Sequence, residues 1–119
     1  MKRDMDLARQ ILLSIEEKSD DSEFSLTAKE SEKQTLLDYQ VALLSDAHLI
    51  QAAKITYHNG SIKWRIERLT WEGHEFLDAA RNETRWNQAK KTIGEKGGSL
   101  TFDVLKAVLA QLARQAVGL

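Results

Sequence analysis

Hydrophobic residues recur at intervals of three and four positions through most of the chain, a spacing typical of helices with one buried side. Polar clusters and glycines interrupt this pattern and mark the ends of separate segments. The spacing predicts five helices: from Asp4 or Asp6 to about Lys18, over Glu32–Ala47, from Thr70 to about Ala80, over Glu83–Lys96, and from Ser99 or Thr101 onward.

The first two helices carry specific expectations for their ends and sides. Arg9 is expected on the outer side of the first helix. Ser31 and Gln34 have the spacing of a capping box, in which the serine accepts a bond from a backbone amide and the glutamine reaches back. His48 follows the second helix, at the point where a left-handed residue usually ends a helix, and histidine is enriched among the non-glycine residues in that conformation.

Between residues 50 and 69 the helical spacing gives way to alternation, which predicts two strands. Asn59-Gly60 lies between them and is the strongest short signal for a two-residue type I′ turn. This turn pairs the residues of an inner face: Tyr57 with Ile62, Ile55 with Trp64, and Ala53 with Ile66. It also pairs those of an outer face: Thr56 with Lys63, Lys54 with Arg65, and Ala52 with Glu67. A brief strand is predicted at Phe24–Leu26.

Helix, brief strand, helix, strand, turn, strand is the chain order of a winged-helix domain, with Glu32–Ala47 in the recognition-helix position and the hairpin as the wing. The helix-turn-helix is reduced, because there is hardly room for the usual second helix before Ser31. A short Gly97-Gly98 connection predicts that the last two helices are antiparallel. The predicted fold is mainly α with a small antiparallel β-hairpin (α+β). It has a winged-helix domain over residues 1–80 and a C-terminal helical hairpin over residues 81–119, packed as one compact unit.

Composition and charge predict the cellular compartment and the class of partner. The chain has 119 residues, 42% of them hydrophobic and 29% charged, as is ordinary for one folded domain. It has no cysteine and no window of about 18 apolar residues, so we predict a cytoplasmic protein without a membrane partner. Residues 1–49 hold 6 basic and 11 acidic side chains, whereas residues 50–96 hold 9 and 6. A surface that meets phosphate is therefore expected in the middle of the chain.

Four stretches of the sequence are similar to one known family: MKRDMDLARQILLSIEE, LLSDAHLI, RLTWEGHEFLDAARNETRW and GGSLTFDVLKAVLAQL. They resemble the bacterial and prophage-encoded family called domain of unknown function 2513, which looks related to YjcQ-like winged-helix proteins. The resemblance covers nearly the whole chain and implies membership and fold, but it brings no activity and no catalytic residues. Family members look to have glycine where this chain has His48.

Charge on the wing gives the first functional hypothesis, nucleic-acid binding by a phage-associated regulator. Lys54 and Arg65 are expected to be cross-strand neighbours, and an anion such as phosphate or a nearby carboxylate would relieve their repulsion. The recognition-position helix sums to −2, so we favour the wing over that helix, although its outward residues, Gln40 among them, could touch bases. A solvated charged face is the alternative. The candidate residues are Lys54, Lys63, Arg65, Arg68, Lys33 and Gln34.

The final helix gives the alternative hypothesis, a protein-interaction adaptor in phage–host conflict. Its apolar residues cover about half the circumference, which is wider than one contact requires. They predict a seam for a protein partner or for a second copy in a homodimer: Val104, Leu105, Val108, Leu109 and Leu112. The chain has no nucleophile–base arrangement, metal-ligand spacing or nucleotide motif. We therefore predict no enzyme activity, no catalytic or metal-ligating residue and no cofactor.

Overall fold

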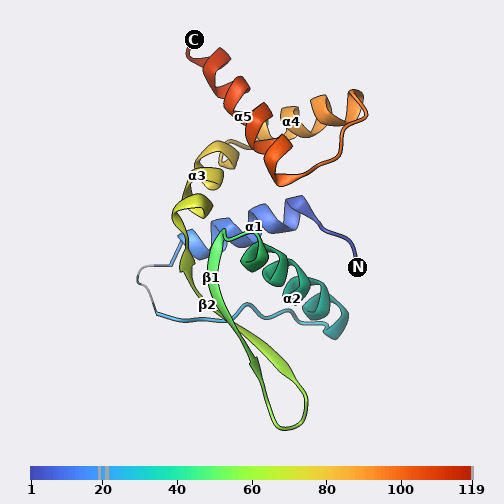
Figure 1. Ribbon diagram of the computed structural model, residues 1–119, viewed down its shortest axis with the longest axis vertical. Helices are drawn as coiled ribbons and strands as arrows, with labels where there is room; N and C mark the ends of the chain where they lie inside the picture. The colour runs from blue at the N-terminus through green and yellow to red at the C-terminus, as the bar shows by residue number, and fades with distance from the viewer. Residues whose placement is uncertain (19, 21, 119) are drawn as a thin grey trace. The chain divides into compact units, whose positions relative to one another are not determined.

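The described part of the chain folds into five helices and one antiparallel hairpin, so the predicted α+β fold class is confirmed (Figure 1). The structure is a computed structural model and describes residues 1–18, 20 and 22–118. Its elements are α1 (Met5–Glu16), α2 (Ser31–Asp46), β1 (Ile50–Thr56), β2 (Ile62–Leu69), α3 (Trp71–Ala80), α4 (Glu83–Glu95) and α5 (Phe102–Ala116). They form two compact units, Met1–His74 and Glu75–Leu119. The predicted packing of the whole chain into one unit stays a prediction.

Helix α1 begins as predicted, because the Asp4 carboxylate accepts a hydrogen bond from the Leu7 amide at 3.0 Å. Its apolar side contributes Ile11 and Leu12 to the core. The outward position predicted for Arg9 is wrong, since this side chain is only 7% exposed. Arg9 lies one turn from both Met5 and Leu12, so it belongs to the buried side of the helix.

Helix α2 does not use the predicted capping box. Its N-cap residue is Glu30, which makes no side-chain capping bond, and Ser31 is already helical. The Gln34 amide instead accepts a hydrogen bond from the Ala28 amide at 2.6 Å and donates to the Leu26 carbonyl at 3.1 Å. The glutamine therefore anchors the preceding loop to the helix rather than closing the helix end.

Gln40 lies in the core of the first unit, which corrects its predicted outward position on α2. Its side chain is 1% exposed. The amide oxygen accepts from the Asp4 backbone amide at 2.9 Å, and the amide nitrogen donates to the Lys2 carbonyl at 3.0 Å. A buried amide needs such partners, and these two bonds fix the N-terminal segment to α2.

The hairpin forms where it is predicted, but its turn has three residues instead of two. Of the turn residues only Gly60 has a positive φ, 83°, whereas a type I′ turn needs a positive φ at Asn59 as well. The Tyr57 amide donates to the Ser61 carbonyl at 2.9 Å, and the Gly60 amide donates to the Tyr57 carbonyl at 2.9 Å. Asn59 stabilises this form, because its side-chain oxygen accepts from the Ser61 amide at 3.0 Å. This pattern is that of a type I turn with a left-handed glycine.

The extra turn residue shifts the register by one, so the predicted pairing of Lys54 with Arg65 is wrong. Lys54 lies opposite Trp64, and Lys63 lies opposite Ile55. Cross-strand partners share a face, so a one-residue shift turns one strand over relative to the prediction. Lys54 is on the face of Trp64, and Lys63 and Arg65 are on the opposite face.

A bulge at Glu67 changes the register again near the base of the hairpin. Gln51 pairs with Arg68 while Ala52 pairs with Ile66, so Glu67 has no partner on β1. The ammonium of Lys18 donates to the Glu67 carbonyl at 2.9 Å, which satisfies an acceptor at the bulge. This hydrogen bond stabilises the bulge.

The predicted brief strand is present as a single bridge. Phe24 pairs with Ile66 through two hydrogen bonds, of 3.0 and 2.7 Å, on the edge of β2 away from β1. Lys18 covers this contact, with its nitrogen 4.6 Å from the centre of the Phe24 ring. The described residues between α1 and α2 contain no helix.

The junction of α2, β1 and α3 is held by backbone contacts. His48 has a φ of 62°, which confirms its predicted left-handed conformation. The Thr70 hydroxyl donates to the His48 carbonyl at 2.5 Å and accepts from the Gly73 amide at 3.0 Å, so Thr70 is the predicted N-cap. The Thr70 amide donates to the Leu49 carbonyl at 2.9 Å. These bonds bring the first turn of α3 against the backbone at Leu49.

Replacing His48 with glycine is expected to stabilise the protein. The left-handed conformation costs a side-chain-bearing residue about 1–2 kcal/mol, and the greater freedom of glycine in the unfolded chain offsets about 0.5–1 kcal/mol. We expect His48→Gly to raise the free energy of unfolding by about 0.5–1 kcal/mol in urea titrations. Ala47→Gly is the matched control and should lower it, because Ala47 has an ordinary φ of −78°. A lower midpoint for His48→Gly would contradict the strain argument.

The second unit has its own aromatic core. The Phe76 ring lies 6.2 Å from the Trp86 ring, nearly perpendicular to it, and 4.3 Å from the Phe102 ring. Both predicted helices, α4 and α5, are present and contact each other, and Thr101 caps α5 as one of the two expected residues. Gly97 ends α4 with a φ of 70°.

Candidate nucleic-acid interface

Three basic residues share the exposed face of β2. Lys63 and Arg65 are two positions apart, so their side chains point the same way. The bulge at Glu67 then returns Arg68 to this face, because Arg68 pairs with Gln51, which alternates in phase with the partners of Lys63 and Arg65. All three side chains are exposed. We call Lys63, Arg65 and Arg68 the basic row.

The members of the basic row differ in their partners. Arg65 lies 3.7 Å from the Glu23 carboxylate in an ion pair whose two side chains are about half exposed, 50% and 49%. Arg68 donates to the Leu69 carbonyl at 3.1 Å and to the Gln51 side chain at 2.9 Å. No described carboxylate forms an ion pair with Lys63. Lys63, the member of the basic row nearest the hairpin tip, is therefore the one whose charge is least neutralised by other residues.

A hollow of about 350 Å³ opens between the basic row and the segment that runs beside β2. Lys63 and Arg65 form one wall, and the opposite wall includes Glu23, Ser25 and Thr27. The Ser25 hydroxyl donates to the Trp64 carbonyl at 2.8 Å, which holds that segment against the strand. The hollow can accept an anionic group beside two cations.

The other predicted nucleic-acid contacts do not join the basic row. Lys54 is exposed, but on the opposite face of the hairpin. Lys33 is on α2 and lies 3.5 Å from the Glu30 carboxylate. Gln34 uses its amide on the preceding loop and on Asp38, at 2.8 Å, so its hydrogen-bonding groups are occupied by the fold.

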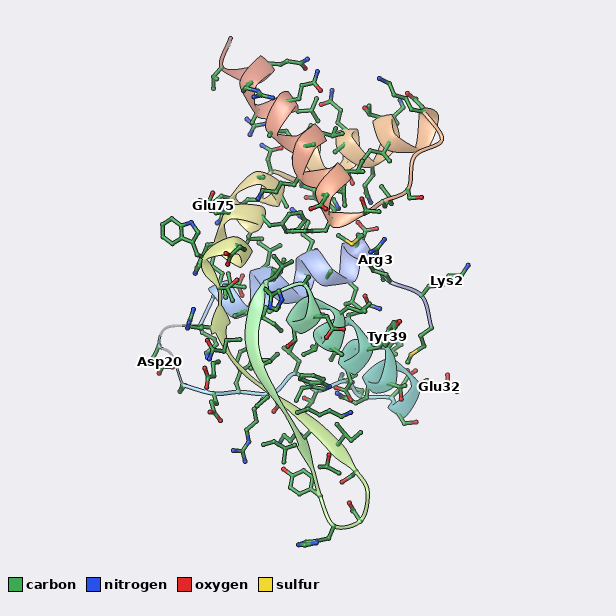
Figure 2. All side chains as sticks on the ribbon, viewed as in Figure 1. Lys2, Arg3, Asp20, Glu32, Tyr39 and Glu75 are labelled. Carbon is green, nitrogen blue, oxygen red and sulfur yellow. The ribbon has the colours of Figure 1, made fainter. Side chains whose placement is uncertain are left out.

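Tyr57 is a part of this face that the sequence prediction misses. The two-residue turn predicts Tyr57 on the inner face, whereas the structure leaves it 45% exposed near the hairpin tip. It lies two positions after Ile55, just past the end of β1, where its amide still bonds to Ser61, so continued alternation places it on the face of Lys63. Its position could have been inferred only from the three-residue turn. The outer hairpin extends away from α1 and α2, with side chains on both of its sides (Figures 1 and 2).

The outer part of the hairpin carries positive charge only, whereas the first unit as a whole is acidic. Residues 50–66 include three basic side chains and no acidic one. The first unit as a whole, residues 1–74, has 10 basic and 13 acidic side chains. Glu32 lies at the start of α2 (Figure 2), and the sequence places Asp38 on the same helix. The basic row is thus a narrow positive strip on an otherwise acidic unit.

A smaller polar hollow, of about 240 Å³, lies at the base of β2, with Lys18, Asp20 and His74 among its lining residues. Its charged groups mainly serve the fold. The Asp20 carboxylate accepts from the Ser22 hydroxyl at 2.5 Å and from the Ser22 amide at 3.0 Å, and these bonds lower the pKa of Asp20. Within the described residues, no three histidine, aspartate or glutamate side chains are grouped to hold a metal ion.

The predicted seam on α5 is only partly available. Leu105 and Leu109 are both 0% exposed, so they are core residues and cannot meet a partner in this conformation. Val104, Val108 and Leu112 line a groove of about 420 Å³ between α4 and α5. The homodimer and the protein partner stay predictions. None of the helices in the described ranges has the length and apolarity needed to cross a lipid bilayer.

Comparison with known proteins places the chain in a family. Residues 2–99 match the family described as "Hypothetical protein (DUF2513)", so the match ends before α5. A Haemophilus influenzae protein described as "Uncharacterized protein" is 40% identical over 120 residues, covering 97% of this chain and 98% of that protein. That likeness extends beyond residue 99 into α5. No solved structure matches the chain. The family match and the relative agree with the four similar stretches of sequence, and the chain belongs to the DUF2513 family.

Proposed function

We propose that this protein is a non-enzymatic nucleic-acid-binding protein and that the basic row of the hairpin is its contact surface. The observation that carries the proposal is the alignment of Lys63, Arg65 and Arg68 on one exposed face, next to a hollow that Lys63 and Arg65 line. Phosphate contacts from lysine and arginine supply most of the sequence-independent affinity for nucleic acids.

The element order supports the same proposal. Two helices followed by a protruding hairpin give the hairpin the position of a wing in a reduced winged-helix domain. Helix α2, in the recognition position, is a poor candidate for base contacts, because Gln40 is buried and the Gln34 amide is occupied. The proposed contact therefore runs through the hairpin and does not need α2 to enter a groove.

Reversing the charge of the basic row is expected to abolish binding. The double variant Lys63→Glu/Arg65→Glu loses at least two phosphate contacts and adds repulsion, so affinity at low salt should fall by roughly 100-fold. The slope of log affinity against log salt should also become shallower, by about 0.7–0.9 per lost contact. Fluorescence anisotropy with labelled random-sequence single strands and duplexes, over a salt series, measures both quantities.

The matched control is Lys91→Glu/Lys106→Glu, which changes the net charge equally at two exposed positions of the second unit. It should bind within about twofold of the wild type if the basic row makes the contacts. The neutral variant Lys63→Gln/Arg65→Gln should lose affinity without creating a carboxylate beside Glu23. Equal losses for the control and the basic-row variants, or no binding by the wild type at low salt, would refute the proposal.

A further inference from the structure

The basic row is a track of cations whose spacing suits the backbone of one nucleic-acid strand. Its two outer members, Lys63 and Arg65, are about 7 Å apart along a single strand, because a strand rises about 3.3–3.4 Å per residue. Arg68 continues the row beyond the bulge on the same face. The outward-facing partners on β1 are not charged: Gln51, Ala53 and Ile55. A single line of cations can contact successive phosphates of one nucleic-acid strand.

Tyr57 supplies an aromatic surface at the outer end of this track. Its side chain is 45% exposed and lies on the face of Lys63, beyond the pair of Ile55 and Lys63. An exposed ring beside a line of cations is the arrangement on which unpaired bases stack, since every base has a flat face and the contact needs no particular sequence.

The surroundings of the basic row disfavour a duplex. Glu23 flanks Arg65 at 3.7 Å, and Asp38 of α2 lines a hollow together with Lys63. A duplex would bring a second phosphate backbone close to these two carboxylates, which would repel it. A single strand can follow the narrow positive strip and avoid them.

We propose that the hairpin binds single-stranded nucleic acid in preference to duplex, with the backbone along Lys63, Arg65 and Arg68 and a base stacked on Tyr57. This inference rests on the proposed nucleic-acid function and specifies its ligand. In this arrangement one phosphate of the strand would enter the hollow that Lys63, Arg65 and Thr27 line. Because Glu23 competes with that phosphate for Arg65, it limits the affinity.

The test compares a short thymine homopolymer, which cannot pair with itself, with the same strand annealed to its complement. Wild-type protein should bind the single strand at least about tenfold more tightly at low salt, the size of effect that stacking of one base produces. Tyr57→Ala should remove about tenfold of the single-strand affinity, and Tyr57→Phe should retain it, because only the ring is needed. Glu23→Gln should bind the single strand several-fold more tightly than wild type.

The outcomes separate this inference from the broader proposal. Equal binding of both forms, with both lost in Lys63→Glu/Arg65→Glu, keeps the nucleic-acid proposal and overturns the single-strand inference. Preference for the duplex, or a Tyr57→Ala variant that binds like wild type, also overturns it. Binding of neither form overturns both. Tyr57 is exposed, so circular dichroism should show all Tyr57 variants folded like the wild type.

Discussion

Gly73→Ala is expected to destabilise the first unit by roughly 3 kcal/mol, the upper part of the range for overpacking. A Cβ atom at this position would overlap the Leu49 carbonyl oxygen and lie 3.0 Å from its carbonyl carbon. The obstacle is backbone, so it cannot be relieved by rotating a side chain. Moving α3 away would stretch the Thr70 bonds to Leu49 and His48, at 2.9 and 2.5 Å.

Urea unfolding of Gly73→Ala should therefore show a lower midpoint with a similar slope. Gly94→Ala is the matched control, because a Cβ there would have no neighbour within 4 Å and the residue lies within α4. Alanine is favoured over glycine in a helix by about 1 kcal/mol, so this control should be more stable than the wild type. A Gly73→Ala variant as stable as the wild type would mean that α3 is not seated against Leu49 as described.

Phe76→Ala is expected to destabilise the second unit by about 3–5 kcal/mol, the usual range for truncating a buried aromatic residue. Phe76 is 0% exposed and contacts the rings of both Trp86 and Phe102. It thus joins the last part of α3 to α4 and α5 within that unit. Its loss should also weaken the near-ultraviolet circular dichroism signal of Trp86, which is 2% exposed.

Two controls bracket this result. Phe76→Leu keeps much of the apolar volume and should cost less than half as much as the alanine variant. Trp71→Ala removes a larger aromatic side chain from the same helix, but Trp71 is 76% exposed, so its effect should lie within about 0.5 kcal/mol. If Trp71→Ala were as harmful as Phe76→Ala, burial would not explain the loss.

Local sequence predicts most of the secondary structure because the deciding interactions are local. Asp4 and Thr70 cap helices through bonds to residues three positions on, at 3.0 Å in each case. His48 adopts its left-handed conformation at a helix end, where the terminal backbone groups favour it. Such features depend on a few neighbouring residues, which the sequence displays directly.

The register of the hairpin could not be predicted in the same way. Asn-Gly is compatible with a two-residue turn and also with a three-residue turn that has glycine in the left-handed position. The turn is stabilised by the hydrogen bond that the Ser61 amide donates to the Asn59 side chain, and the register at the base of the hairpin depends on a bulge held by Lys18 from a distant segment. The residues of the candidate site could not be predicted correctly for the same reason, because the register places Lys54 on the face opposite Lys63 and Arg65.

Contacts between distant segments also explain the errors on α2. Gln34 and Gln40 look like solvent-facing polar residues by their type, and helical spacing alone does not place them. Gln40 is buried because the backbone of residues 2–4 needs its amide, and Gln34 is occupied because the loop at 26–28 does. Neither partner can be recognised from the residues of α2 alone.

The bulge at Glu67 also changes how insertions and deletions in β2 would act. Along the outer part of the strand, odd-numbered positions such as Lys63 and Arg65 face outward, whereas at the base the even-numbered Arg68 does. Deleting Glu67 would remove the bulge and restore regular alternation, so Lys63, Arg65 and Arg68 would stay on one face and Leu69 on the other. Pairing through Glu67 without a bulge would instead put Arg68 on the buried face and Leu69 on the outer face, so the bulge is what keeps three basic residues in one row on a strand of this length.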